Sequence, residues 1–375
     1  MAKVAVLRTT PKSVISDYES LMELADYKKA IPKSARTIVK INLSWSLYYP
    51  ACSTPPWQLD GVLKTLRGSG YKDLLAVENQ TVVTHPWKGA YQNKWLPVLR
   101  KHDVKFQPLT DVKWVKFNPK HEMLAMHDIF GEILIPEIYR KTNVVHLPTV
   151  KTHGHTVMTG AMKDAFGGLI PKYRHHAHKK IHEILVDLLA IQKEVHKGIF
   201  AVMDGSVCGN GAGPRTMDPF IGNVILASDD QVAIDAIAAK IMGFEPLDID
   251  YIRIAHERGL GMGDVDQIDI AGMDKKDVMS LNFGFKTGKS PIVLGDQILR
   301  KKTMNIRWLH HLLFNTPIFK TFIFASELYH DKIWYNLAGK KKIDEFMDTE
   351  WGELFKNYKY GPYPKYTDVK EWNPY

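Results

Sequence analysis

The sequence predicts an α/β fold of two mainly parallel α/β lobes flanking a cleft, with a helical, aromatic and basic C-terminal extension. Three observations predict it. Short apolar strands alternate with helical segments in the N-terminal part, and strands and helices follow one another again between residues 198 and 272. Such alternation is typical of parallel sheets with crossover helices. Towards the C-terminus, the composition turns aromatic and basic. We therefore expect an α/β core over residues 1–285, and a helical extension with an extended tail over residues 286–375.

The predicted N-terminal strands cover residues 3–8, 36–45 and 72–79, which are rich in apolar and β-branched residues. Between them, residues 14–31 and 54–70 have the spacing of amphipathic helices.

Polar residues follow these strands. Thr54 is the expected N-cap of the second helix, with Pro55 at the first helical position. In a parallel sheet, ligands collect at the carboxyl ends of the strands, where Asn42, Ser44, Cys52 and Glu78 are expected.

In the second half of the core, a strand over residues 143–150 is expected to end at Lys151, and another is expected to end at Asp204. The residues GNGAGP, 209–214, are expected to form a glycine-rich turn. Asp229 or Asp230 is a predicted helix N-cap, and Gly243 closes that helix as its C-cap.

Composition excludes several classes of protein. The chain has 375 residues, of which 45% are apolar and 24% charged, enough to bury a full core. Two cysteines, Cys52 and Cys208, are too few for a disulfide scaffold or a cysteine-ligated zinc or iron–sulfur centre. We expect no signal peptide, no membrane-spanning segment and a cytoplasmic location. The net charge of +9 admits nucleic acid, anionic lipid or an acidic small molecule as a partner.

Several blocks together resemble the family called domain of unknown function 362. They are VKINLSW with TPPWQLDGVLKTLRGSGY, LPTVKTHGHTVMTGAMKDAFGG, MDGSVCGNGAGP, and ILASDDQVAIDAIAAKIMG followed by RGLGMGD. The resemblance covers roughly residues 1–285 and implies a site without an established reaction. Many relatives also carry a ferredoxin-like module, whose cysteines this chain lacks, so no intrinsic iron–sulfur cluster is expected.

Lys151 and Lys163 are candidate ligand-binding cations. Lys151 ends a buried strand, where a lysine either leaves the core for solvent or meets an anion; the resemblance favours the anion. Small neighbours of Lys163 allow either close approach of a ligand or tight helix packing. His153 and His155 share one face of a strand and suit either a phosphate or a metal.

A divalent metal bound by His153, His155 and Asp204 is one alternative, with Glu78 or a histidine of the run RHHAHKKIH as another source of the third ligand. The spacing matches no recognised metal motif. The same basic run is otherwise a solvated helix start, and its Arg174 suits a phosphate or carboxylate.

The glycine-rich segment after Asp204 predicts either an anion-binding nest, through Gly209, Gly211 and Gly213, or a plain turn. Asp204 would act as a general base if burial raised its pKa. Cys52 precedes a predicted helix and is either a packed thiol or a nucleophile.

Two functions follow. The first is an enzyme acting on a small anionic substrate, with Lys151, His153, Asn42, Arg174 and the three glycines binding it and with Asp204, His155 and Lys163 catalytic. The second is a non-catalytic binder of nucleic acid or an anionic membrane surface through its basic charge and aromatic C-terminal helices. Those helices otherwise pack on the core or join two copies of the chain.

Overall fold

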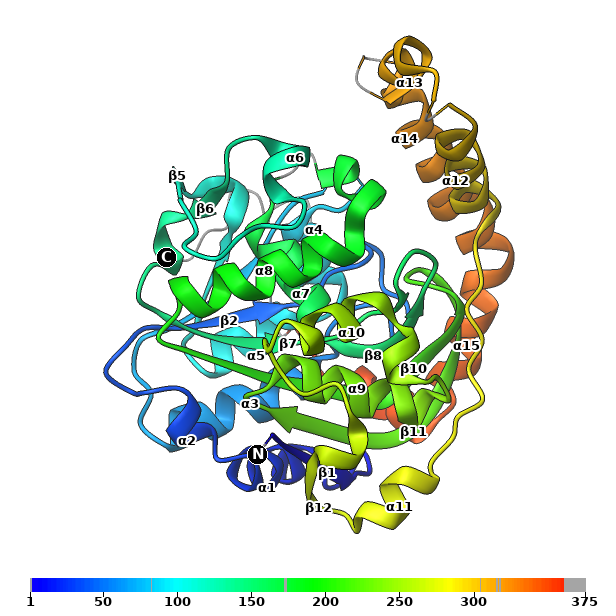
Figure 1. Ribbon diagram of the computed structural model, residues 1–375. Coiled ribbons are helices and arrows are strands. Elements are labelled where there is room, and N and C mark those ends of the chain that lie inside the picture. Colours follow the sequence, from blue (N-terminus) through cyan, green and yellow to red (C-terminus); the bar gives the residue numbers. More distant parts are fainter. Residues whose placement is uncertain are drawn as a thin grey trace.

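The α/β class is confirmed by the computed structural model, which describes residues 2–81, 83–171, 174–303, 305–314, 316 and 318–360. Ten strands form one mixed, mainly parallel sheet with helices on both faces (Figure 1). Strands from both expected lobes belong to this single sheet. The expected extended tail, residues 361–375, lies outside the described residues.

The strands of this sheet are ordered β12-β1-β11-β10-β7-β2-β3-β4, with β8 paired to β10 and β9 paired to β8. Along this order β11 is antiparallel to both of its neighbours, and the other neighbours are parallel. A two-stranded ribbon of β5 and β6 stands apart. The bounds are β1 Lys3–Arg8, β2 Thr37–Ile41, β3 Leu74–Glu78, β4 Lys105–Pro108, β5 Trp114–Lys116, β6 Leu134–Pro136, β7 Asn143–Leu147, β8 Thr149–His153, β9 Val157–Met158, β10 Gly198–Ala212, β11 Thr216–Ser228 and β12 Asp269–Gly272.

Two hydrophobic layers hold the helices to the sheet. Alternate residues of a strand face opposite sides, so Ile38 of β2 packs in one layer and Val39 in the other. The first layer includes α7 (Ala161–Leu169), α8 (Ile181–Val195), α9 (Gln231–Met242) and α10 (Asp250–Glu257). The second includes α1 (Val14–Leu24), α3 (Pro56–Gly68) and α5 (Trp95–Lys101).

The other core helices are α2 Tyr27–Ala30, α4 Pro86–Gln92, α6 Met126–Phe130, α11 Lys275–Ser280, α15 Lys340–Met347 and α16 Glu350–Asn357. Short 3-10 turns lie at Leu109–Asp111, Glu137–Tyr139, Arg174–Lys180, Pro246–Asp248 and Val265–Gln267.

The predicted caps of α9 are confirmed, whereas that of α3 is wrong. The Asp230 carboxylate accepts hydrogen bonds from two backbone N–H groups of the first turn of α9, and Gly243 closes the helix in the left-handed conformation. Helix α3 has Pro55 as its N-cap residue. Thr54 instead accepts from the backbone N–H of Asn42 and donates to the carbonyl of Leu147, so it ties β2 to β7.

The predicted strand end at Asp204 and the glycine-rich turn are also wrong. Strand β10 continues to Ala212 and pairs antiparallel with β11, so the connecting turn is residues 213–215. The glycines serve close packing. A Cβ on Gly213 would lie 1.8 Å from the carbonyl oxygen of Thr152, and one on Gly209 would lie 2.5 Å from the sulfur of Met217. The hairpin therefore lies directly against β8.

Three helices project from the core and are called the arm: α12 (Pro291–Thr303), α13 (Arg307–Phe314) and α14 (Phe319–Glu327) (Figure 1). The π-helix η6 (Leu328–Gly339) returns to the core, where Trp334 contacts the rings of Trp45 and Tyr49. Among the residues described, no helix is both long and apolar enough to cross a membrane.

Replacing Gly213 by alanine should destabilise the protein by about 1–3 kcal/mol or more, because the added methyl group would overlap a backbone carbonyl that has little freedom to move. Gly68→Ala is the matched control, since its Cβ would meet nothing within 4 Å and should change stability by no more than about 1 kcal/mol. Urea unfolding of both variants measures this difference. Equal stability of the two variants would contradict the packing of the hairpin on β8.

A candidate anion-binding site at the carboxyl edge of the sheet

A hollow of about 240 Å³, called here the polar hollow, opens where strands β2 and β3 end. The chain runs from β2 outward to β3 and β4 and then returns to β7 on the other side of β2, so the strand order reverses at β2. Open α/β sheets bind ligands at such a switch point, outside the carboxyl ends of the strands. The hollow is lined by Lys40, Asn42, Leu43, Ser44, Glu78, Thr81, Val83, Thr84, His153, His155, Lys163, Asp164, Phe166, Gly167, His178, Pro214, Arg215 and Val293.

The floor of the polar hollow is a buried ion cluster around Lys40. Its ammonium group donates to the carbonyl of Ile41 at 2.7 Å, to Glu78 Oε2 at 3.0 Å and to Asp164 Oδ1 at 3.3 Å. All three charged side chains are buried. Since unpaired charges are costly to bury, this cluster fixes the ends of β2 and β3 against α7.

The two carboxyl groups of the floor have different environments. Burial raises the pKa of Glu78, and the attraction of Lys40 only partly offsets this. Burial also acts to raise the pKa of Asp164, but Lys40 and a hydrogen bond with His146 lower it below its usual value. His146 Nδ1 lies 3.0 Å from Asp164, and its Nε2 lies 2.6 Å from Gln192. Carboxyl groups whose pKa values are pushed apart are suited to separate acid and base roles.

Glycines of α7 allow the helix to approach this floor. Asp164, Gly167 and Gly168 share one helix face by their i, i+3, i+4 spacing. A Cβ on Gly167 would lie 3.0 Å from Lys40 Nζ, and one on Gly168 would lie 2.7 Å from the hydroxyl of Tyr139. The segment DAFGG therefore provides both a charged partner for Lys40 and the space that the Lys40 side chain occupies.

Two neutral histidines form one wall. His153 Nδ1 accepts from the backbone N–H groups of His155 at 3.2 Å and Thr156 at 3.3 Å, which assigns the ring proton to Nε2. Burial holds the pKa of His153 well below its usual value. His155 Nδ1 accepts from the amide of Gln297 at 3.0 Å, and burial lowers its pKa to about 4. Its ring stacks on His178. Both histidines therefore carry an N–H donor on Nε2.

Lys163 and Arg215 supply positive charge. The Lys163 ammonium lies 5.4 Å from the ring centre of Phe166 on the same helix. The turn between β10 and β11 carries Arg215, whose Nη2 donates to the hydroxyl of Ser326 at 3.2 Å. Its Nη1 is buried and has no hydrogen-bond partner among the described residues. A buried guanidinium nitrogen without a partner is costly, and an anionic ligand would satisfy it.

Asn42, His153, His155 and Lys163 are predicted site residues that the structure brings together around the polar hollow. Lys151 and the three glycines do not line it. Lys151 is 0% exposed, and its ammonium group donates to Asn42 Oδ1 at 2.7 Å, to the carbonyl of Cys52 at 2.6 Å and to the hydroxyl of Thr149 at 2.9 Å. All three of its N–H groups are thus used to orient Asn42 and its neighbours.

Asp204 faces the opposite side of the sheet, with the layer that contains Tyr18 and Trp57. It accepts hydrogen bonds from Tyr18 at 2.6 Å, Trp57 at 3.1 Å and Ser206 at 2.9 Å. Burial raises its pKa to about 6. The structure therefore separates Asp204 from His153 and His155, with which it was expected to bind a metal. Within the described ranges, no group of three or more His, Cys, Asp or Glu residues is arranged to hold a metal ion.

The remaining candidates divide between buried and undescribed groups. The side chain of Arg174 lies outside the described part of the chain. Cys52 and Cys208 are free, buried thiols. Burial raises the pKa of Cys52 to about 11, which opposes a role as thiolate nucleophile. Sequence reasoning missed Lys40, Asp164 and Arg215.

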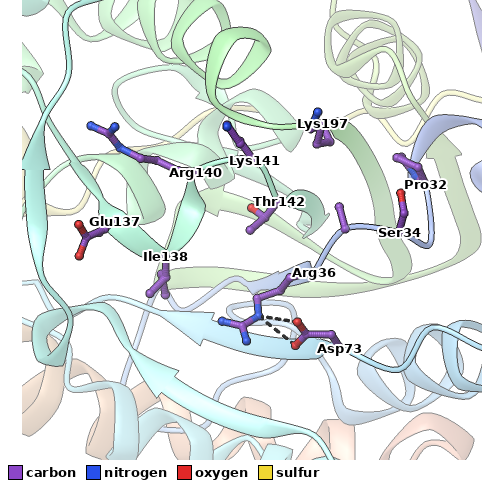
Figure 2. Close-up of a pocket in the computed structure, with 11 residues that line it drawn as sticks. Pro32, Ser34, Arg36, Asp73, Glu137, Ile138, Arg140, Lys141, Thr142 and Lys197 are labelled. Atoms are coloured by element: carbon purple, nitrogen blue, oxygen red, sulfur yellow. Dashed lines mark hydrogen bonds and ion pairs between the residues drawn. The ribbon is translucent and has the colours of Figure 1, made fainter.

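A second hollow, of about 720 Å³, lies at the opposite edge of the sheet, where β2, β7 and β10 begin (Figure 2). Arg140, Lys141 and Lys197 lie along one side of it. On the other side, Arg36 is paired with Asp73 at 2.9 Å. Because parallel sheets bind ligands at the carboxyl edge, we place the functional site at the polar hollow.

The fold is that of an α/β protein, and its polar hollow, lined by Lys40, Lys163 and Arg215 together with Glu78 and Asp164, is a candidate ligand site at the carboxyl edge of the sheet. The family described as domain of unknown function (DUF362) matches residues 37–240, and the chain belongs to this family. It is 23% identical over 174 residues to thylakoid-associated protein sll1697 of Synechocystis sp., a match that covers 46% of this chain and 52% of that relative. The chain thus spans about half the length of that curated relative. No solved structure matches it.

The buried Lys151 should make stability depend on pH in alkaline solution. Burial lowers its pKa to about 8, whereas an unfolded lysine titrates near about 10.4. Between these values the unfolded chain holds a proton that the folded chain has lost, so stability rises with pH by up to about 1.4 kcal/mol per unit. Relative to Lys151→Met, the wild type should therefore gain stability over this window in urea unfolding. Lys12→Met, on the surface, is the control. Parallel pH curves for the wild type and Lys151→Met would contradict this.

Proposed function

We propose that the protein is an enzyme that acts on a small anionic substrate, bearing a carboxylate or phosphate group, in the polar hollow. The observation that carries this proposal is the buried Nη1 of Arg215, which has no hydrogen-bond partner in the described part of the chain and lies beside a hollow that Lys163 and His153 also line. An anion bound in the hollow would supply both the missing acceptor and a compensating charge.

In this proposal, each group at the hollow has a separate task. Arg215 and Lys163 hold the anionic group. The Nε2–H groups of His153 and His155 donate to a substrate oxygen, since neutral imidazoles polarise an oxygen without adding charge. Because Asp204 faces the other side of the sheet, we assign the proton transfer to Glu78, whose raised pKa brings it closer to neutral pH.

Anion binding should depend on Arg215 and Lys163. Arg215→Met and Lys163→Met should each weaken binding of inorganic phosphate or malonate at least about tenfold, because each removes a charged hydrogen-bond donor. Isothermal calorimetry measures the affinity. Lys12→Met removes the same charge at an exposed position and should leave it unchanged. If all three variants bind like the wild type, the polar hollow is not the anion site.

A second candidate function is association with an anionic membrane surface, and one observation favours it. Trp308 and Phe324 of the arm are 70% and 65% exposed, and Leu337 of η6 is 78% exposed. Lys301 and Lys302 of the arm are exposed as well. Exposed aromatic and basic side chains on helices are typical of surfaces that lie at the lipid interface. The relative named as thylakoid-associated points the same way.

The double variant Trp308→Ser, Phe324→Ser should lose most of its binding to vesicles that contain anionic phospholipid, because burial of these rings in the interface supplies the apolar part of the attraction. Cosedimentation with vesicles measures this. Leu24→Ser, an exposed apolar residue of α1, serves as the control. Unchanged cosedimentation of the double variant would exclude the arm as the contact surface.

A further inference from the structure

An apolar hollow of about 570 Å³ lies between helices α12 and α14 of the arm. Its walls are largely aliphatic and aromatic. They are formed by Val83, His155, His178, Pro291, Ile292, Val293, Gly295, Asp296, Ile298, Leu299, Arg300, Lys302, Phe322, Ile323, Ala325 and Ser326. Among the charged residues, Arg300 is paired with Asp296 at 2.7 Å and lies 4.0 Å from the ring centre of Phe314. These two charges therefore neutralise each other, which leaves the walls suited to hydrocarbon.

The apolar hollow adjoins the polar hollow. Val83, His155, His178 and Val293 line both. Hydrogen bonds across the border hold the two together. Gln297 of α12 donates to His155, and Arg215 of the polar hollow donates to Ser326, which lines the apolar one. A molecule whose charged end contacts Arg215 would therefore place its other end between α12 and α14.

We propose that the substrate is a single-chain anionic amphiphile, with its carboxylate or phosphate head in the polar hollow and its hydrocarbon chain in the apolar hollow. This inference rests on the proposed function and adds the substrate class to it. Lys163 and Arg215 lie at one end of the combined space. Most residues at the other end are apolar, and there Arg300 is paired with Asp296 and Lys302 is exposed, so the charge distribution matches that of such a molecule. The apolar hollow is also the larger of the two, and a small polar anion would leave it unfilled.

Affinity should rise with chain length. Each methylene group removed from water contributes about 0.8 kcal/mol, which corresponds to roughly a fourfold gain in affinity. Calorimetry with hexanoate, octanoate, decanoate and dodecanoate, below their micellar concentrations, should therefore give successive gains of roughly tenfold or more per two methylenes for the wild type. The corresponding alkyl phosphates form a second series and distinguish the two head groups.

Filling the apolar hollow should remove this gain. Gly295 lines it, and a Cβ at this position would meet nothing within 4 Å, so Gly295→Phe adds a ring without a clash at its first atom. Ala325→Phe fills the hollow from α14. Both variants should bind inorganic phosphate like the wild type but show little dependence on chain length. Gly295→Ala and Leu24→Ser should keep the wild-type dependence, since the first adds one methyl group and the second lies outside the hollow.

The outcomes separate this inference from the proposed function. Phosphate binding that depends on Arg215, without a chain-length effect, would overturn the amphiphile and leave the anion site intact. A chain-length effect that survives both filling variants would place the chain elsewhere and also overturn the inference. If the wild type binds neither phosphate nor any alkyl anion, the proposed function fails together with it. A chain-length effect lost only in the filling variants supports the proposal.

Discussion

The position of the site depends on one buried ammonium group, that of Lys40. It joins the end of β2 to the end of β3 through Glu78 and to α7 through Asp164. Each partner alone would be a charge removed from water without compensation, so the three segments are stable in this position only together. Gly167 and Gly168 leave the space that the cluster needs. The polar hollow above it is thus a consequence of how three charges are buried.

Features of the fold that follow from local spacing could be predicted from the sequence. Strand β1, the cores of β2 and β3 and both caps of α9 lie where residue patterns placed them. The β10–β11 hairpin could not be predicted in this way. A polar Asp204 and a run of glycines indicate a strand end. In the structure, hydrogen bonds from Tyr18 and Trp57 stabilise Asp204 inside the core, and the glycines leave space for residues of neighbouring strands. Both causes are distant in the sequence.

The residues of the candidate site likewise include some that could be predicted from the sequence and some that could not. His153, His155 and Lys163 could be found because they cluster near the end of one predicted strand. Lys40 could not, since its partners lie 38 and 124 residues further along the chain. Lys151 illustrates the converse. It stands two residues before His153, yet its ammonium group donates to Thr149 and to Asn42 and Cys52, which lie 109 and 99 residues earlier in the chain. Proximity in sequence does not reveal which hydrogen bonds a buried cation has already made.

If the polar hollow binds a ligand as proposed, the hydrogen bonds of Gln297 with His155 and of Ser326 with Arg215 would link its occupancy to the docking of the arm on the core. Linkage is reciprocal: whatever free energy a docked arm adds to ligand affinity, a bound ligand returns to the docking of the arm. The family match ends at residue 240, before the arm begins. Gln297 and Ser326, which would carry such coupling on the arm, therefore lie outside the matched range, whereas the charged floor of Lys40, Glu78 and Asp164 lies within it.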